Sequence, residues 1–74
     1  METYILDTTG LQCPEHVLKI AAKATEMTDG DILEVIGDCP TFSHNVIRWC
    51  TRINKPLLFI QDIGDGKMKC QIKF

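Results

Sequence analysis

Residues 3–18 have the sequence TYILDTTGLQCPEHVL, which joins a short strand to the start of a helix through one loop. Thr3 to Leu6 is rich in strand-forming residues, and Thr8, Thr9 and Gly10 are typical of a loop. A proline after Cys13 is typical of the first positions of a helix. The stretch therefore predicts a β-strand and an α-helix with a cysteine at their junction.

The rest of the chain predicts a second unit of this kind and then a hairpin. A strand is expected at Ile32–Ile36 and a helix between Pro40 and Asn54. Residues 57–63 and 68–74 predict two further strands, joined by a turn at residues 64–66. The order is therefore βαβαββ. Strands linked by a helix are expected to be parallel, which gives a mixed sheet with both helices on one face.

Apolar spacing predicts which side of each helix is buried. For the first helix, expected to run to about Met27, the predicted stripe is Val17, Leu18, Ala21, Ala22 and Ala24. For the second helix, the predicted stripe is Phe42, Val46, Trp49, Cys50 and Ile53. We expect Trp49 to be a core anchor packed between this helix and the sheet.

Length and composition exclude several classes of protein. A chain of 74 residues has room for one domain, residues 1–74, with one modest core. The net charge of -2 and the scattered basic residues argue against nucleic-acid binding. The longest apolar run, Leu57 to Ile60, is too short for a membrane span, and Glu2 does not fit a signal peptide. We therefore expect a cytoplasmic protein, and the absence of a glycine-rich phosphate loop predicts no cofactor.

The four cysteines divide into two pairs. Cys50 and Cys70 lie on predicted apolar faces and should be buried small hydrophobes. Cys13 and Cys39 each precede a proline at a predicted helix start, close to the N-cap. The free backbone N–H groups and the dipole of a helix start stabilise a thiolate. Cys13 is therefore the first candidate for chemistry, and Cys39 is a possible second thiol.

Metal binding is not expected, because the chain has no C-x2-C pair and both histidines fall on predicted polar helix sides. His16 follows Cys13 by three residues. It could hold a thiolate or take part in proton transfer, or it could simply be a solvated helix residue.

The frame Leu6-Asp7-x-x-Gly10-Leu11-x-Cys13-Pro14 resembles the signature of the TusA-like (SirA-like) sulfur-carrier family. The similarity covers nearly the whole chain. It implies a two-layer α/β sandwich with sheet order 1-2-4-3 and strand four antiparallel to the others. It also implies a persulfide carried on the cysteine of a Cys-Pro-x-Pro motif, which corresponds to Cys13. The sulfur would come from a desulfurase or rhodanese-like donor and pass to an acceptor protein, in a relay rather than as a stand-alone enzyme.

Two departures from the family pattern concern the same region. His16 replaces the second proline of the motif, and Asp38-Cys39 replaces the acidic pair usual before the second helix. Pro14 would shape the helix start, with Lys19 and Asp38 as further candidates near the site.

Two other functions stay open at this point, together with the donor, the acceptor and the oligomeric state. One is a dithiol redox protein that uses Cys13 and Cys39. The other is a regulatory or RNA-binding module on the same fold. Because strands one and two should be adjacent and parallel, the loops that leave them should bring Cys13 and Cys39 close together.

Overall fold

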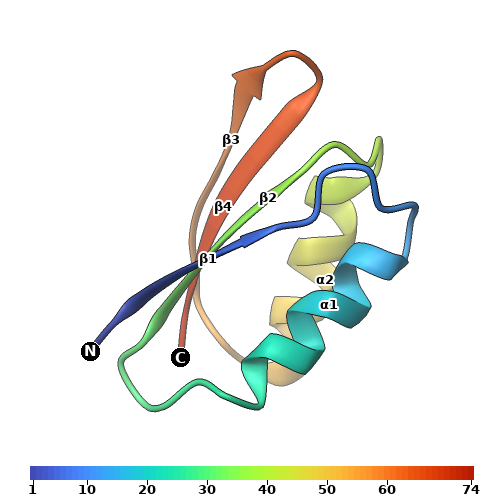
Figure 1. Cartoon of the computed structure of the whole chain (residues 1–74). Helices are drawn as coiled ribbons and strands as arrows, with labels where there is room; N and C mark the ends of the chain where they lie inside the picture. The colour runs from blue at the N-terminus through green and yellow to red at the C-terminus, as the bar shows by residue number, and fades with distance from the viewer.

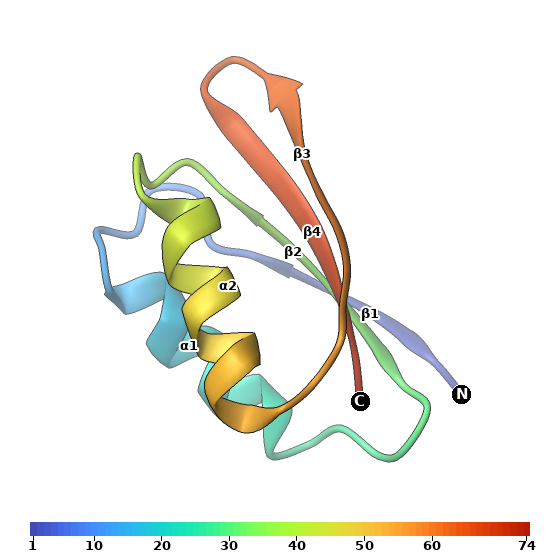
Figure 2. The ribbon, with the colours of Figure 1, turned by 180° about the vertical axis from the view of Figure 1, so that it is seen from behind.

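The computed structural model describes residues 1–74 and has a four-stranded sheet with both helices packed on one face (Figure 1, Figure 2). The elements in chain order are β1 (Thr3–Asp7), α1 (Glu15–Ala24), β2 (Ile32–Gly37), α2 (Phe42–Ile53), β3 (Leu57–Gly64) and β4 (Lys67–Lys73). The predicted βαβαββ order is confirmed. Both helices are shorter than predicted, since α1 ends at Ala24 and α2 begins two residues after Pro40.

The strand order is β1-β2-β4-β3, with β1 parallel to β2 and β4 antiparallel to both of its neighbours. The register places a row of apolar residues across the sheet on its helix-covered face. This row runs through Leu6, Val35, Cys70 and Ile60. The order 1-2-4-3 and the antiparallel fourth strand are thereby confirmed.

The core lies between the sheet and the two helices. Its nine buried residues are Ile20, Leu33, Val35, Cys39, Phe42, Val46, Cys50, Cys70 and Ile72. The alternation of buried residues along β2 and β4 follows the two-residue repeat of a strand with one covered face. The Gly64-Asp65-Gly66 turn closes the hairpin with positive φ at all three residues. The end of this hairpin extends beyond the helices (Figure 1).

The predicted buried side of α1 is wrong. The buried residues are His16 and Ile20, whereas Leu18 is 65% exposed. This helix is short and rich in alanine, so several rotations about its axis bury similar apolar area. The structure has the rotation in which the His16 ring stacks on Phe42, with ring centroids 5.5 Å apart.

Trp49 packs against the core as predicted, but it is half-buried and not a fully buried anchor. The ring lies at the edge of the core with its centroid 6.3 Å from that of Phe74. Phe42, Val46 and Cys50 are the fully buried members of the predicted stripe. Neither helix is long and apolar enough to cross a membrane.

Candidate functional site: the cysteine pair beyond β1 and β2

The site lies where β1 and β2 end side by side. The Thr8 backbone N–H and its Oγ1 hydroxyl both donate hydrogen bonds to the Ile36 carbonyl oxygen, each at 2.7 Å. Further along, the Gly10 N–H donates to Asp38 Oδ1 at 3.0 Å. These bonds hold the loop after β1 against the loop after β2.

The two loops bring Cys13 and Cys39 together. Their Cα atoms lie 6.0 Å apart, and their sulfur atoms are joined as a disulfide. The predicted proximity of these two residues is confirmed. Cys13 is exposed, whereas only 6% of Cys39 is exposed. One cysteine of the pair is therefore at the surface, and the other is buried.

Neither cysteine is itself the N-cap of its helix, contrary to the prediction. The N-cap residues are Pro14 for α1 and Thr41 for α2. The Thr41 hydroxyl donates a hydrogen bond to Cys13 Sγ at 3.2 Å. This hydroxyl, rather than a helix N–H group, is the hydrogen-bond donor to the Cys13 sulfur.

Thr41 also connects the pair to α2. Its Oγ1 lies 3.4 Å from Cys39 Sγ and accepts a hydrogen bond from Asn45 Nδ2 at 3.0 Å. Sequence reasoning missed both polar residues. The available signal was the position of Thr41 two residues after Cys39, with Asn45 four residues further on the same helix side.

His16 lies buried beside the cysteine pair, so the prediction that it falls on a polar helix side is wrong. Its side chain has no exposed surface, and both ring nitrogens lack a hydrogen-bond partner. Burial lowers the pKa of His16 below its ordinary value of 6.5. Burial therefore favours the neutral form of the ring at pH 7.

The donor atoms of Cys13, His16 and Cys39 all lie within 4.8 Å of one another. Two sulfurs and an imidazole at this spacing could hold a soft metal ion when the sulfurs are free. In the structure the sulfurs are bonded to each other, and the His16 ring lies next to the disulfide.

Of the remaining predicted site residues, Asp38 and Pro14 adjoin the cysteine pair and Lys19 does not. Asp38 holds the two loops together through Gly10, and Pro14 directly follows Cys13 at the start of α1. Lys19 is exposed further along α1 and forms no hydrogen bond or ion pair with the cysteine loops.

Cys50 and Cys70 are buried free thiols, as predicted. Burial raises the pKa of Cys50 to about 11 and that of Cys70 to about 12. Both thiols therefore stay protonated at neutral pH and are unsuited to nucleophilic attack.

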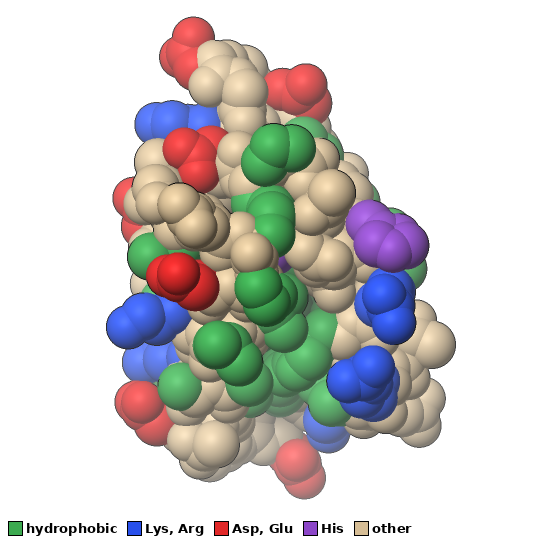
Figure 3. Space-filling view, turned by 90° about the vertical axis from the view of Figure 1, so that its right-hand side faces the viewer, with side chains coloured by type: hydrophobic (Ala, Val, Ile, Leu, Met, Phe, Trp, Pro, Cys, Tyr) green, Lys and Arg blue, Asp and Glu red, His purple; other side chains and the backbone are tan.

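Two surface grooves flank α2. One begins at Pro14, next to Cys13, and runs between the helices, where Val17 and Trp49 line it together with Arg48 and Arg52. Figure 3 shows the helix layer, where apolar side chains form a column and basic side chains lie on both sides of it.

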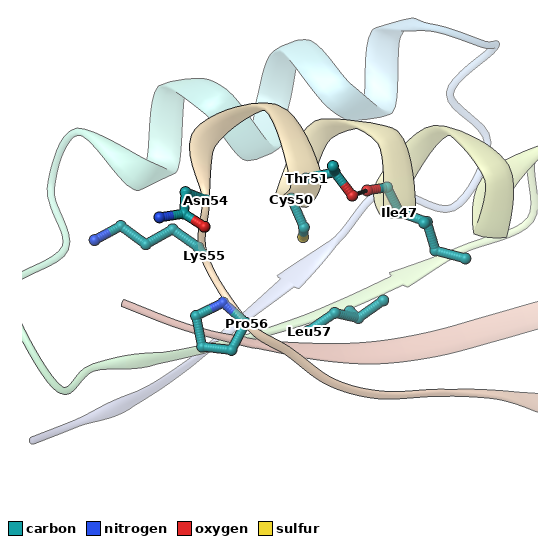
Figure 4. A pocket seen from close by; sticks show the side chains of 7 residues that line it. All are labelled: Ile47, Cys50, Thr51, Asn54, Lys55, Pro56 and Leu57. Carbon is teal, nitrogen blue, oxygen red and sulfur yellow. Dashed lines mark hydrogen bonds between the residues drawn. The ribbon is translucent and has the colours of Figure 1, made fainter.

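The other groove has a volume of about 410 Å³ and lies between the end of α2 and the start of β3, with Cys50 at its base (Figure 4). It is at the opposite end of α2 from the cysteine pair. The first groove is thus the one that adjoins Cys13.

The sequence is similar to known proteins over most of its length. Residues 4–73 match the family model described as sulfurtransferase TusA. Curated relatives named sulfur carrier protein TusA occur in Pseudomonas paraeruginosa (strain DSM 24068 / PA7) and Pseudomonas aeruginosa (strain LESB58). Each is 33% identical to this chain over 58 residues, which cover 78% of this chain and 73% of the relative. Because the family model matches nearly the whole chain, the chain belongs to the sulfurtransferase TusA family.

Proposed function

We propose that this protein accepts sulfane sulfur as a persulfide on Cys13 and passes it to an acceptor protein. The observation that carries the proposal is the exposure of Cys13, the only exposed cysteine of the four, at the cysteine position of the family motif. The Thr41 hydroxyl, 3.2 Å from Cys13 Sγ, can donate a hydrogen bond to a thiolate or a persulfide anion there. Membership of a sulfur-carrier family supports the same role.

The partners follow from this chemistry. A desulfurase or a rhodanese-like protein would supply the sulfur, and a second protein would receive it. The unit that performs the transfer is residues 1–74 as one domain, which is small enough to present Cys13 within a partner's active site. We place the relay in the cytoplasm, where reducing conditions keep Cys13 as a free thiol.

The disulfide favours one second candidate, a dithiol redox protein that cycles Cys13 and Cys39 between bonded and free forms. The two functions differ in the number of cysteines that they require. Sulfur acceptance requires Cys13 alone, whereas a dithiol cycle requires both cysteines.

The test compares single cysteine variants after reduction and incubation with glutathione persulfide, by intact mass spectrometry and peptide mapping. We expect Cys39→Ser to gain one sulfur atom on Cys13 and Cys13→Ser to gain none. Cys50→Ser with Cys39→Ser is the matched control and should load like Cys39→Ser, because Cys50 is buried. Loss of sulfur uptake in Cys39→Ser would favour the dithiol function.

A further inference from the structure

We propose that Cys39 resolves a persulfide on Cys13, so that the carried sulfur leaves as sulfide and the Cys13–Cys39 disulfide remains. The inference rests on the proposed function, since it begins from the loaded Cys13. It adds a second outcome for the carried sulfur. A partner that binds before Cys39 attacks receives the sulfane sulfur. Without a partner, the chain releases this sulfur as sulfide.

The position of Cys39 selects which sulfur of the persulfide is attacked. A persulfide has an inner sulfur, which is Cys13 Sγ, and an outer sulfur, which is the cargo. The Sγ atom of Cys39 is bonded to Cys13 Sγ in the structure. Attack on the inner sulfur therefore produces the bond that this fold already accommodates, with Cα atoms 6.0 Å apart.

The reaction balances without an external oxidant. The Cys39 thiolate forms a bond to Cys13 Sγ, the bond from Cys13 Sγ to the outer sulfur breaks, and that sulfur leaves with the bonding electron pair. The sulfane sulfur is reduced to sulfide, and the two cysteine sulfurs are oxidised to the disulfide. A thiol reductant is needed only to reopen the disulfide for another round.

His16 provides a destination for the proton that Cys39 must lose. One of its ring nitrogens lies within 4.8 Å of both sulfurs, and neither nitrogen has a hydrogen-bond partner. A neutral imidazole can take the Cys39 proton and return it to the leaving hydrosulfide. Other titratable side chains around this region are Glu15 on α1, Asp38 in the Cys39 loop and His44 in the first turn of α2.

Burial restricts Cys39 to this internal task. Only 6% of the surface of Cys39 is exposed, so a protein partner has poor access to it. The Cys39 sulfur is, however, within bonding distance of the Cys13 sulfur. The loops that expose Cys13 thus also place the buried thiol of Cys39 next to the Cys13 sulfur.

The test measures sulfide and disulfide after glutathione persulfide is added to the reduced protein under chelating conditions. We expect the wild type to release one sulfide per chain above the level seen with Cys39→Ser, to form one Cys13–Cys39 disulfide and then to stop. Cys39→Ser should keep the sulfur on Cys13. If the wild type keeps its persulfide as Cys39→Ser does, the inference is wrong and the carrier function stands. If Cys39→Ser takes up no sulfur on Cys13, both are wrong.

A second variant tests the role given to His16. His16→Phe keeps an aromatic ring against Phe42 and removes the nitrogens. We expect it to release sulfide roughly a hundredfold more slowly at pH 7 with the same final stoichiometry. The deficit should vanish at alkaline pH, where the solution itself deprotonates Cys39. A deficit that is equal at all pH values would show that His16 has no part in proton transfer.

Discussion

His16 is an enclosed titratable side chain, and its burial should make the stability of the protein depend on pH. Its pKa in the folded state is lowered by desolvation, so below pH 6.5 the unfolded chain binds a proton that the folded chain does not. The free energy of unfolding should therefore fall as pH drops below 6.5, by up to about 1.4 kcal/mol per pH unit. The fall ends once pH reaches the folded-state pKa. Urea unfolding at pH 7 and pH 5 measures this difference.

The second histidine provides the matched control. His44 is exposed in the first turn of α2, so His44→Gln should keep the same pH dependence as the wild type. In His16→Phe, the free energy of unfolding should fall less between pH 7 and pH 5 than in the wild type, because the contribution of His16 is removed. If both variants behave like the wild type, the His16 ring is not desolvated in solution.

At the scale of single residues, the sequence predicted the cysteines better than their polar neighbours. Cys13 was identified by the motif, and Cys50 and Cys70 by the apolar pattern of their elements. Thr41 escaped because its contact with Cys13 joins residues 28 positions apart, which no local pattern encodes. His16 was misplaced because a histidine near a helix start is polar by type, whereas its burial depends on the ring of Phe42.

Gly37, the last residue of β2, should be intolerant of any side chain. A Cβ atom at this position would lie 2.6 Å from Thr8 Oγ1 and 2.7 Å from the ring of Phe42. Gly37→Ala should therefore cost about 1–3 kcal/mol of stability by overpacking. It should also slow closure of the disulfide, because Thr8 ties together the two cysteine loops. Urea unfolding and the rate of thiol oxidation measure the two effects.

Gly66 in the β3–β4 turn is the control for this change. It has a φ of +73°, with nothing within 4 Å of an added Cβ atom. Gly66→Ala should strain the turn but leave the rate of disulfide closure unchanged. Equal effects of the two substitutions on closure would mean that Gly37 does not position the loops.

At the scale of elements, the strands could be predicted because each carries its own signal. The alternation in residues 67–73 and the turn at residues 64–66 define the hairpin without reference to the rest of the chain. The positions of both helices were predicted, but the buried side of α1 was not. Its ten residues include three alanines and do not specify one buried side. The rotation is decided by packing against α2, which sequence periodicity does not contain.

At the scale of the whole molecule, the disulfide should contribute a large part of the free energy of unfolding. It joins residues 26 positions apart, and closing a loop of that length in the unfolded chain corresponds to about 3.5 kcal/mol. The free energy of unfolding of a small domain is about 5–15 kcal/mol. Reduction should therefore lower the urea midpoint markedly, and unfolding with and without reductant measures the change.

The double variant Cys13→Ser with Cys39→Ser should show one midpoint in both conditions. This control separates loss of the disulfide from any effect of the reductant itself. A wild-type midpoint that does not respond to reductant would contradict the predicted contribution of the disulfide.

The 6.0 Å separation of the Cys13 and Cys39 Cα atoms has a consequence for competition among copies of the protein. At this spacing the sulfurs can be bonded or free with little movement of the backbone. The reduced chain should then present nearly the same outline around Pro14 as the oxidised chain. A partner that recognises this outline binds both forms, but only the reduced form can take its sulfur. In the proposed relay, an oxidised chain would therefore occupy a partner without taking its sulfur, and a rising oxidised fraction would inhibit the relay more than the loss of working copies alone.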